Sequence, residues 1–215
     1  MEFDENFSYW LGLVHADGFI SKYVIKGKNQ TKYEFGLETI SEVLIKEFCS
    51  GLKQLGRHVS ILKTKRNTYK CKISANSIVD TLASLNIKLR EGKYNPPESV
   101  CKNDKLFGAY LAGVIDGDGD IRIKRKNTYP QCMIRVSSGS LQANLNQLIK
   151  QKMKCAVLET FREVNRKGKV MRWYELEFLI SRKNVKFISS FVLPHIKLTY
   201  KKDKMKNFIE NAMVV

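Results

Sequence analysis

Two aspartates occupy matching positions in the sequence, which suggests that they share one chemical role. Asp17 and Asp118 each follow an apolar stretch, each precede a glycine, and lie 101 residues apart. The segments around them, YWLGLVHADGFI (9–20) and YLAGVIDGDGDI (110–121), align without a gap, so the chain contains an internal repeat. Carboxylates suit hard divalent cations such as Mg²⁺, and paired metal sites assist in-line attack on phosphodiesters. The repeated acids therefore suggest hydrolysis of a nucleic-acid backbone.

A helix stop is the alternative interpretation of any single Asp-Gly pair, and for one copy alone it is the better one. Two copies at equivalent positions make a functional role the better interpretation. A carboxylate at a helix C-terminus opposes the helix dipole, and two such carboxylates repel each other unless a cation lies between them. Purely structural acids would be poorly placed here, so we favour metal binding.

Small residues recur four positions apart on each expected motif helix. They are Gly12 and Ala16 in the first copy and Gly113 and Gly117 in the second. Without bulky side chains two helix backbones can approach closely, so the two helices are expected to pack together and to bring Asp17 and Asp118 side by side. Gly18 and Gly119 suit the position just past a helix end, where φ is often positive.

Periodicity predicts the same order of elements after each motif. In the first half we expect strands near 19–27, 32–40, 57–65 and 68–74, with helices near 41–55 and 76–85. In the second half we expect strands near 120–127, 131–138, 154–164 and 169–180, with helices near 140–153, 182–192 and 200–213. The fold class is α+β, with two pseudo-symmetric αββαββα halves at 1–95 and 96–215, joined by a linker at about 91–104 that contains Pro96-Pro97.

The charge of the chain predicts a polyanionic partner. Lys and Arg number 38 against 21 Asp and Glu, which leaves a net charge of +17 spread along the whole sequence. Five scattered cysteines indicate neither a zinc site nor a disulfide framework. The apolar run 107–115 is far shorter than the roughly 20 residues of a membrane span, and the acidic N-terminus is unlike a signal peptide, so we expect an intracellular protein.

Both motif segments resemble the LAGLIDADG motif of the homing endonucleases, closely in LAGVIDGDG (111–119) and more loosely in WLGLVHADG (10–18). The resemblance implies a monomeric, intron-encoded, site-specific endonuclease that makes a double-strand cut in a long, pseudo-symmetric duplex DNA. It implies Asp17 and Asp118 as ligands of Mg²⁺, with Mn²⁺ as a substitute and the backbone of Ala16 and Gly117 beside them. His15 stands where the second copy has Asp116, and we expect a hydrogen-bonded or solvated histidine there, not a ligand.

The strands after each motif alternate apolar and basic residues. Period two places Ile121, Ile123, Ile134 and Val136 on a face packed by helices, and Arg122, Lys124 and Arg135 on the opposite face. In the family, antiparallel sheets form a saddle on duplex DNA, so the residues expected to bind DNA are Lys22, Lys26, Lys28, Lys32, Lys63, Lys65, Lys70, Lys72, Arg122, Lys124, Arg135, Arg162 and Arg172. For any single lysine, an ordinary solvated position is the simpler interpretation.

Family members also place a basic residue near each metal centre, where it can orient water or stabilise charge. Lys93 and Lys201 are the candidates, and Lys88, Lys197 and Lys202 are close rivals. Two other functions stay open. An RNA-binding intron maturase would use the same basic surface, whereas a catalytically silent DNA-binding regulator is disfavoured because both acids are present.

Overall fold

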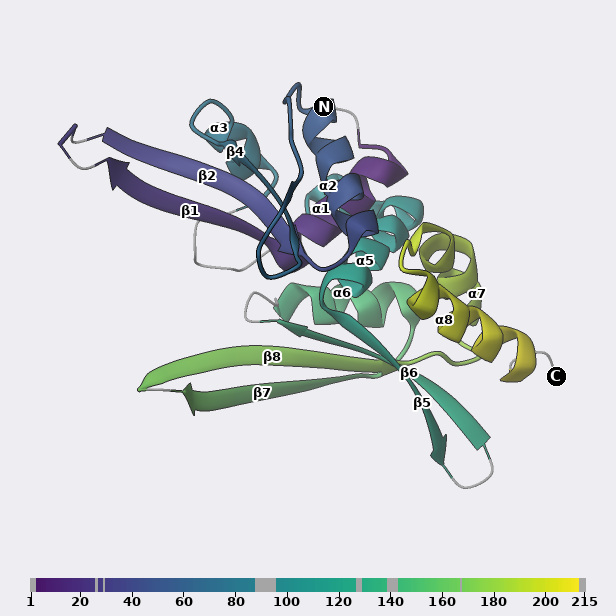
Figure 1. Cartoon of the computed structure of the whole chain (residues 1–215). Coiled ribbons are helices and arrows are strands. Elements are labelled where there is room, and N and C mark those ends of the chain that lie inside the picture. Colours follow the sequence, from purple (N-terminus) through teal and green to yellow (C-terminus); the bar gives the residue numbers. More distant parts are fainter. Residues whose placement is uncertain are drawn as a thin grey trace.

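The computed structural model describes residues 3–25, 27–28, 30–87, 96–126, 129–138, 143–166 and 168–212. The first half contains α1 (Glu5–Asp17), β1 (Gly18–Ile25), β2 (Gln30–Thr39), α2 (Glu42–Gln54), β3 (Leu62–Lys63), β4 (Tyr69–Ser74) and α3 (Val79–Ser84). The second half contains α4 (Glu98–Lys102), α5 (Asp104–Asp118), β5 (Gly119–Lys126), β6 (Tyr129–Ser138), α6 (Ala143–Met153), β7 (Val157–Arg166), β8 (Lys169–Leu179), α7 (Val185–Phe187) and α8 (Thr199–Ala212). Figure 1 shows α1 and α5 between two sheets.

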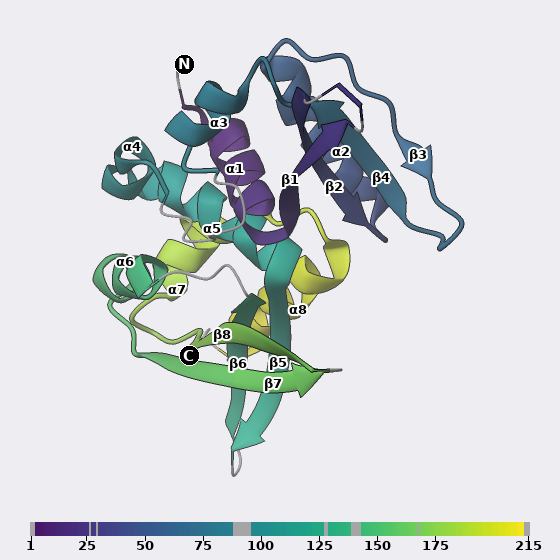
Figure 2. The ribbon, with the colours of Figure 1, turned by 90° about the vertical axis from the view of Figure 1, so that its left-hand side faces the viewer.

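The two sheets have equivalent topologies. Sheet A has the strand order β1-β2-β4-β3 and sheet B the order β5-β6-β8-β7, and all neighbouring strands are antiparallel. Each sheet begins directly after a motif helix, since β1 follows α1 and β5 follows α5 (Figure 2). The predicted α+β fold with two pseudo-symmetric halves is confirmed.

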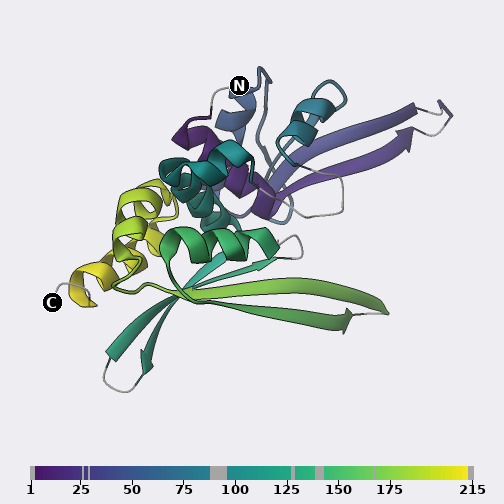
Figure 3. The same ribbon diagram turned by 180° about the vertical axis from the view of Figure 1, so that it is seen from behind.

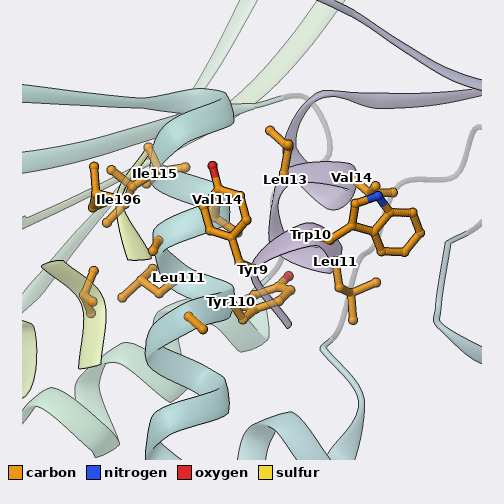
Figure 4. Packing of buried hydrophobic residues seen from close by; sticks show 14 of the residues in the cluster. Tyr9, Trp10, Leu11, Leu13, Val14, Tyr110, Leu111, Val114, Ile115 and Ile196 are labelled. Atoms are coloured by element: carbon orange, nitrogen blue, oxygen red, sulfur yellow. The ribbon is translucent and has the colours of Figure 1, made fainter. Parts of the chain in front are cut away.

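The helices α1 and α5 pack against each other through the predicted small residues. A Cβ added at Gly12 would fall on the backbone carbonyl of Tyr110, and a Cβ added at Gly113 would fall on that of Tyr9. Figure 4 shows these two helices side by side, with their aliphatic and aromatic side chains packed around the crossing. Each helix starts at a side-chain cap: Asp4 accepts from Phe7 N at 2.6 Å, and Asn103 accepts from Lys105 N at 2.9 Å.

The remaining helices cover one face of each sheet. In the first half, Trp10, Phe35 and Phe48 form edge-to-face and stacked ring contacts that join α1, sheet A and α2. In the second half, α6 lies along β7 and β8 (Figure 3), with Leu145 and Ile149 in the core. Among the residues that the structure describes, the opposite face of each sheet carries no helix of its own half, and it is called the helix-free face below.

Two predicted elements differ in length or type. The strand expected at 57–65 is reduced to Leu62–Lys63, which pair with Lys70 and Tyr69 of β4. It ends before Thr64, because Thr64 and Thr68 pair as the base of the hairpin turn that contains Asn67 at φ 59°. The helix expected at 182–192 is only briefly α-helical. It continues as a π-helical turn (Ile188–Val192) and a 3₁₀ turn (Leu193–His195), where Pro194 has no N–H for a regular helix.

The prediction of a positive φ after each motif helix was wrong. Gly18 has φ −71° and Gly119 has φ −86°, and both are extended. Glycine fits here for a steric reason, because the strand turns back tightly over the last helical turn. A Cβ at Gly18 would come within 3.1 Å of Val14 Cα, and one at Gly119 within 2.7 Å of Ile115 Cα.

The segment expected to link the halves contains a short helix. Pro97 caps α4, which occupies Glu98–Lys102, consistent with the tolerance of proline at helix starts. Of the five cysteines, Cys49, Cys71 and Cys132 are buried. Within the described ranges, no helix is long and apolar enough to cross a membrane.

Candidate metal centre and nucleic-acid interface

Asp17 and Asp118 are the last residues of α1 and α5, and they line one open cleft. The close helix crossing sets this arrangement, since a Cβ added at Gly117 would stand 3.5 Å from Asp17 Cβ and 2.6 Å from Ala16 Cβ. The same cleft is lined by Glu38, Thr39 and Ser41 at the end of β2, and by Tyr200 and Lys201 at the start of α8. The structure therefore brings the two repeated acids together.

The cleft suits a hard cation more than a soft or structural metal. Among the described residues, no three His, Cys, Asp or Glu side chains cluster as a complete metal site. Two carboxylates at adjacent helix ends, with backbone oxygens beside them, form a partial set of oxygen ligands. Magnesium sites are often of this kind, with water and substrate phosphate completing the shell.

Burial raises the pKa of Asp17 above its usual range, and the nearby positive charge of Lys201 partly offsets this increase. A buried carboxylate gains its charged form most readily next to a cation. A cation bound in the cleft would therefore favour the charged form of Asp17.

Lys201 is the predicted basic residue that the structure places in this cleft. Its Nζ is buried and donates to the carbonyl oxygens of Ile115 at 2.7 Å and Asp116 at 2.9 Å. Burial lowers the pKa of Lys201, and Asp116, Asp118, Asp120 and Asp17 oppose that shift. The amine thus caps the last turn of α5 and holds the backbone that carries Asp118.

Two other candidate lysines, Lys197 and Lys202, do not line this cleft. Lys197 Nζ is 3.6 Å from Glu47 and stands over the Tyr9 ring, and Lys202 Nζ is 3.4 Å from the Pro194 carbonyl oxygen. Lys93 and Lys88 lie outside the described residues.

The residues two positions before the acids form an asymmetric pair. Tyr9 OH donates to Asp116 at 2.8 Å, and Asp116 also accepts from Lys197 N at 2.7 Å. In the other copy, Tyr110 OH lies 2.9 Å from His15 Nδ1, and His15 Nε2 lies 3.2 Å from the Leu85 carbonyl oxygen. Because a carbonyl only accepts, Nε2 carries the proton and Tyr110 donates to Nδ1.

Burial lowers the pKa of His15 to about 3, so this side chain is neutral, as a hydrogen-bonded core histidine should be. Tyr9 and Tyr110 were not among the predicted site residues. Their matched positions in the repeat were the available signal. Glu38 and Tyr200, which also line the acid cleft, carried no comparable signal because only the fold brings them there.

In sheet A, the expected DNA-binding lysines divide between the two faces. The register places Lys32, Lys70 and Lys72 on the helix-free face. Lys70 pairs with Glu38 at 3.0 Å and Lys72 with Glu34 at 2.8 Å, so this face is less basic than its lysines alone suggest.

Other lysines of the first half lie away from that face. Lys22 and Lys63 pair with Tyr33 and Tyr69, which puts them on the side of the sheet that the helices cover, although Lys22 itself is exposed. Lys28 and Lys65 lie in hairpin turns, and Lys26 lies outside the described residues.

In sheet B, arginines and acids alternate on the helix-free face. Arg122 and Arg135 contact Asp120, Arg135 also lies 3.7 Å from Glu175, and Arg162 lies 3.1 Å from Glu175. This group of side chains, Arg122, Arg135, Arg162, Asp120 and Glu175, is called the arginine network. Lys124 is exposed next to it, and the side chain of Arg172 lies outside the described part of the structure.

One expectation for the opposite face of sheet B was only partly right. Ile121, Ile134 and Val136 are buried under the helices, but Ile123 is 47% exposed. Ile123 lies toward the outer end of the β5–β6 hairpin, where it lines an open pocket together with Asn207 and Phe208 of α8. The alternation of residues along the strand predicted the correct face for Ile123, but how far α8 extends over the sheet decides how much of Ile123 is buried.

No protein-family model matches the chain. The uncharacterized protein MJ0314 of Methanocaldococcus jannaschii is 23% identical over 130 residues, which are 58% of this chain and 45% of that protein. The chain thus spans less than half the length of this relative.

Solved structures resemble the whole chain. Variants of the homing endonuclease I-DmoI give a TM-score of 0.59 at 18% identity, covering 90% of this chain and 98% of that one. I-DmoI in complex with DNA and Mn gives 0.55 at 20% identity, covering 87% and 96%. The LAGLIDADG meganuclease I-AabMI bound to uncleaved DNA gives 0.56 at 11% identity, covering 99% and 91%. This chain has the fold of the single-chain, two-motif LAGLIDADG homing endonucleases.

Proposed function

We propose that this chain is a site-specific DNA endonuclease that makes a metal-dependent double-strand cut in a long, pseudo-symmetric duplex target. The observation that carries the proposal is the convergence of Asp17 and Asp118 in one cleft at the ends of two packed helices. Directly after each acid a sheet begins, and basic side chains stand on its helix-free face. One surface thus combines cation-binding acids with groups that suit a polyanion.

Asp17 and Asp118, with the backbone at Ala16 and Gly117, would hold divalent cations, preferentially Mg²⁺ with Mn²⁺ as a substitute. When bound, such ions supply Lewis-acid stabilisation of the charge that develops on a cleaved phosphodiester. The complex of I-DmoI with DNA and Mn supports this assignment by similarity of fold. The two acids come from different halves of the repeat, which suits one cut in each strand.

Lys201 is proposed to act on the reaction through the geometry of α5. Its amine holds the carbonyl oxygens of Ile115 and Asp116, and it brings a positive charge beside the acids. Lys93 is proposed as its counterpart in the first half, on the sequence alone. The halves are proposed to be 1–95 and 96–215.

Strands placed in a major groove can read base edges through arginine, lysine and amide side chains. On sheet A, Lys32, Lys70 and Lys72 would serve this purpose, and on sheet B Arg122, Lys124, Arg135 and Arg162. A chain that carries both motifs suits a monomer on a target whose two halves differ. The intron-encoded setting rests on the motif resemblance.

The test is cleavage of a randomised duplex DNA library with Mg²⁺, followed by sequencing of the cut ends. The matched control is Asp118→Asn, which keeps the shape of the side chain and removes its charge, and a chelator is the second control. We expect recurrent staggered double-strand cuts that both controls abolish, with DNA binding by Asp118→Asn largely retained. Binding of duplex DNA or of structured RNA without any cutting would refute the nuclease.

A further inference from the structure

Sheet B carries an apolar hollow on its helix-free face. Its floor is Met133, and its sides include Leu158, 60% exposed, and Leu179, 39% exposed. The register pairs Met133 with Leu179 and Leu158 with Glu177, so these side chains share one face. Three apolar side chains therefore lie together on the face that also carries the arginine network.

This hollow lies on the sheet face opposite the core under the helices, and Phe178 and Cys155 line the hollow as well as belonging to or packing against that core. The alternate residues Ile134 and Phe178 point to the helix side and are buried there. Met133 is also buried, but it does not belong to the contiguous cluster that forms the core. Burial of Met133 comes from its neighbours on the helix-free face.

The surroundings of the hollow are those of a nucleic-acid surface. Lys124, Lys154 and Lys183 line its rim, together with Gln131 and Glu177. On β5, Arg122 of the arginine network stands next to Lys124 on the same face, and it pairs with Met133 of the floor. The hollow thus continues the surface that the proposed function lays against DNA.

We propose that this hollow reads a thymine in the target through its C5-methyl group. The inference rests on the proposed function. Apolar side chains can neither donate to nor accept from base edges, and in the major groove the thymine methyl is the apolar group that a base pair presents. Gln131 on the rim can make the paired contact that an amide makes with adenine N6 and N7. A T·A pair thus fits both the floor and the rim.

The distance of that T·A pair from the cut follows from the spacing of residues along β5. On β5, Lys124 lines the hollow and Arg122 pairs with its floor residue Met133. These two residues lie six and four residues after Asp118. At about 3.3 Å per residue and about 3.4 Å per base pair, the pair lies within about six base pairs of the cut. The arginine network lies nearer the cut and favours guanine acceptors.

The test replaces single thymines by deoxyuridine, which lacks only the methyl group. Each thymine within about six base pairs of the cut, in the half contacted by sheet B, is exchanged in turn in the recovered target. Dissociation constants are measured without divalent metal and cleavage rates with Mg²⁺. For the wild-type chain we expect one position where deoxyuridine weakens binding about fourfold, the effect of one buried methyl group.

Leu158→Ala should bring the thymine-to-deoxyuridine ratio at that position close to one, and Leu179→Ala should reduce it. Val170→Ala is the matched control, because Val170 is 58% exposed on the same strand as Leu179 but points to the other face. No sensitive thymine, or a ratio unchanged by Leu158→Ala, overturns the inference while leaving the nuclease intact. If the wild-type chain cuts no duplex at all, the randomised-library experiment already shows this, and the result overturns both the thymine inference and the proposed nuclease.

Discussion

Adding one methyl group at the crossing of α1 and α5 tests whether the approach of these helices sets the acid site. In Gly113→Ala the new Cβ would fall on the Tyr9 carbonyl oxygen and stand 2.7 Å from Leu13 N, whereas ordinary contacts lie at 3.4–4 Å. Both obstacles are backbone atoms, so no side chain can rotate away and the helices must move apart.

Two opposing contributions to the free energy of unfolding decide whether Gly113→Ala is less or more stable than the wild-type chain. Alanine is a better helix former than glycine by about 0.5–1 kcal/mol, which favours the variant. Overpacking a well-filled core costs about 1–3 kcal/mol, and this contact is more severe than most. We therefore expect a net loss of about 1–2 kcal/mol in the free energy of unfolding, measured by urea denaturation.

Gly12→Ala provides a sharper test, because Gly12 meets Tyr110 at the same crossing. One separation of the helices relieves both new contacts. The double variant should therefore lose much less than the sum of the two single losses, a coupling typical of residues in contact. Cleavage should fall more than DNA affinity in each variant, because the separation displaces Asp17 from Asp118. Additive losses, or a stabilised variant, would refute this account of the site.

Three further outcomes are expected. Tyr9→Phe should cost about 1.5–3 kcal/mol of stability because Tyr9 donates to the Asp116 carboxyl, and Tyr110→Phe should cost only about 1 because it donates to neutral His15; equal losses in denaturation curves would argue against this. Burial lowers the pKa of His195 and that of His15, so the unfolded chain takes up protons first, and stability present above about pH 6.5 is lost as pH falls below it. In thermal melts, His195→Gln should remove part of that slope and leave the part due to His15. DNA affinity should fall steeply with salt in binding titrations, in proportion to the phosphates contacted, and a flat dependence would contradict a basic interface.

The features predicted correctly are those that local sequence determines. The periodicity of a helix or a strand is visible within a few residues, and each element occurs twice because the sequence is repeated. Gly12 and Gly113 were informative because a missing side chain in an apolar helix has few explanations other than a close neighbour.

The features missed depend on partners far away in the chain. Glu34 and Glu38 neutralise Lys72 and Lys70, and neither pairing is visible before the register of β2 with β4 is known. Lys22 looked equivalent to Lys32, but the two point to opposite faces, because Lys22 lies across from Tyr33, the neighbour of Lys32 in β2. Period two alone divides a strand into two faces without saying which one the helices cover.

The two halves share a backbone plan but differ in the chemistry they present. Sheet A offers lysines held by single glutamates, whereas sheet B offers forked guanidinium groups joined through Asp120 and Glu175 beside an apolar hollow. Arginine forks favour guanine and apolar side chains favour thymine, whereas a lysine selects less strictly. Two such surfaces cannot read the same half-site equally well. A pseudo-symmetric fold with unequal faces therefore favours a target whose halves differ, and sheet B should account for more of its sequence selectivity.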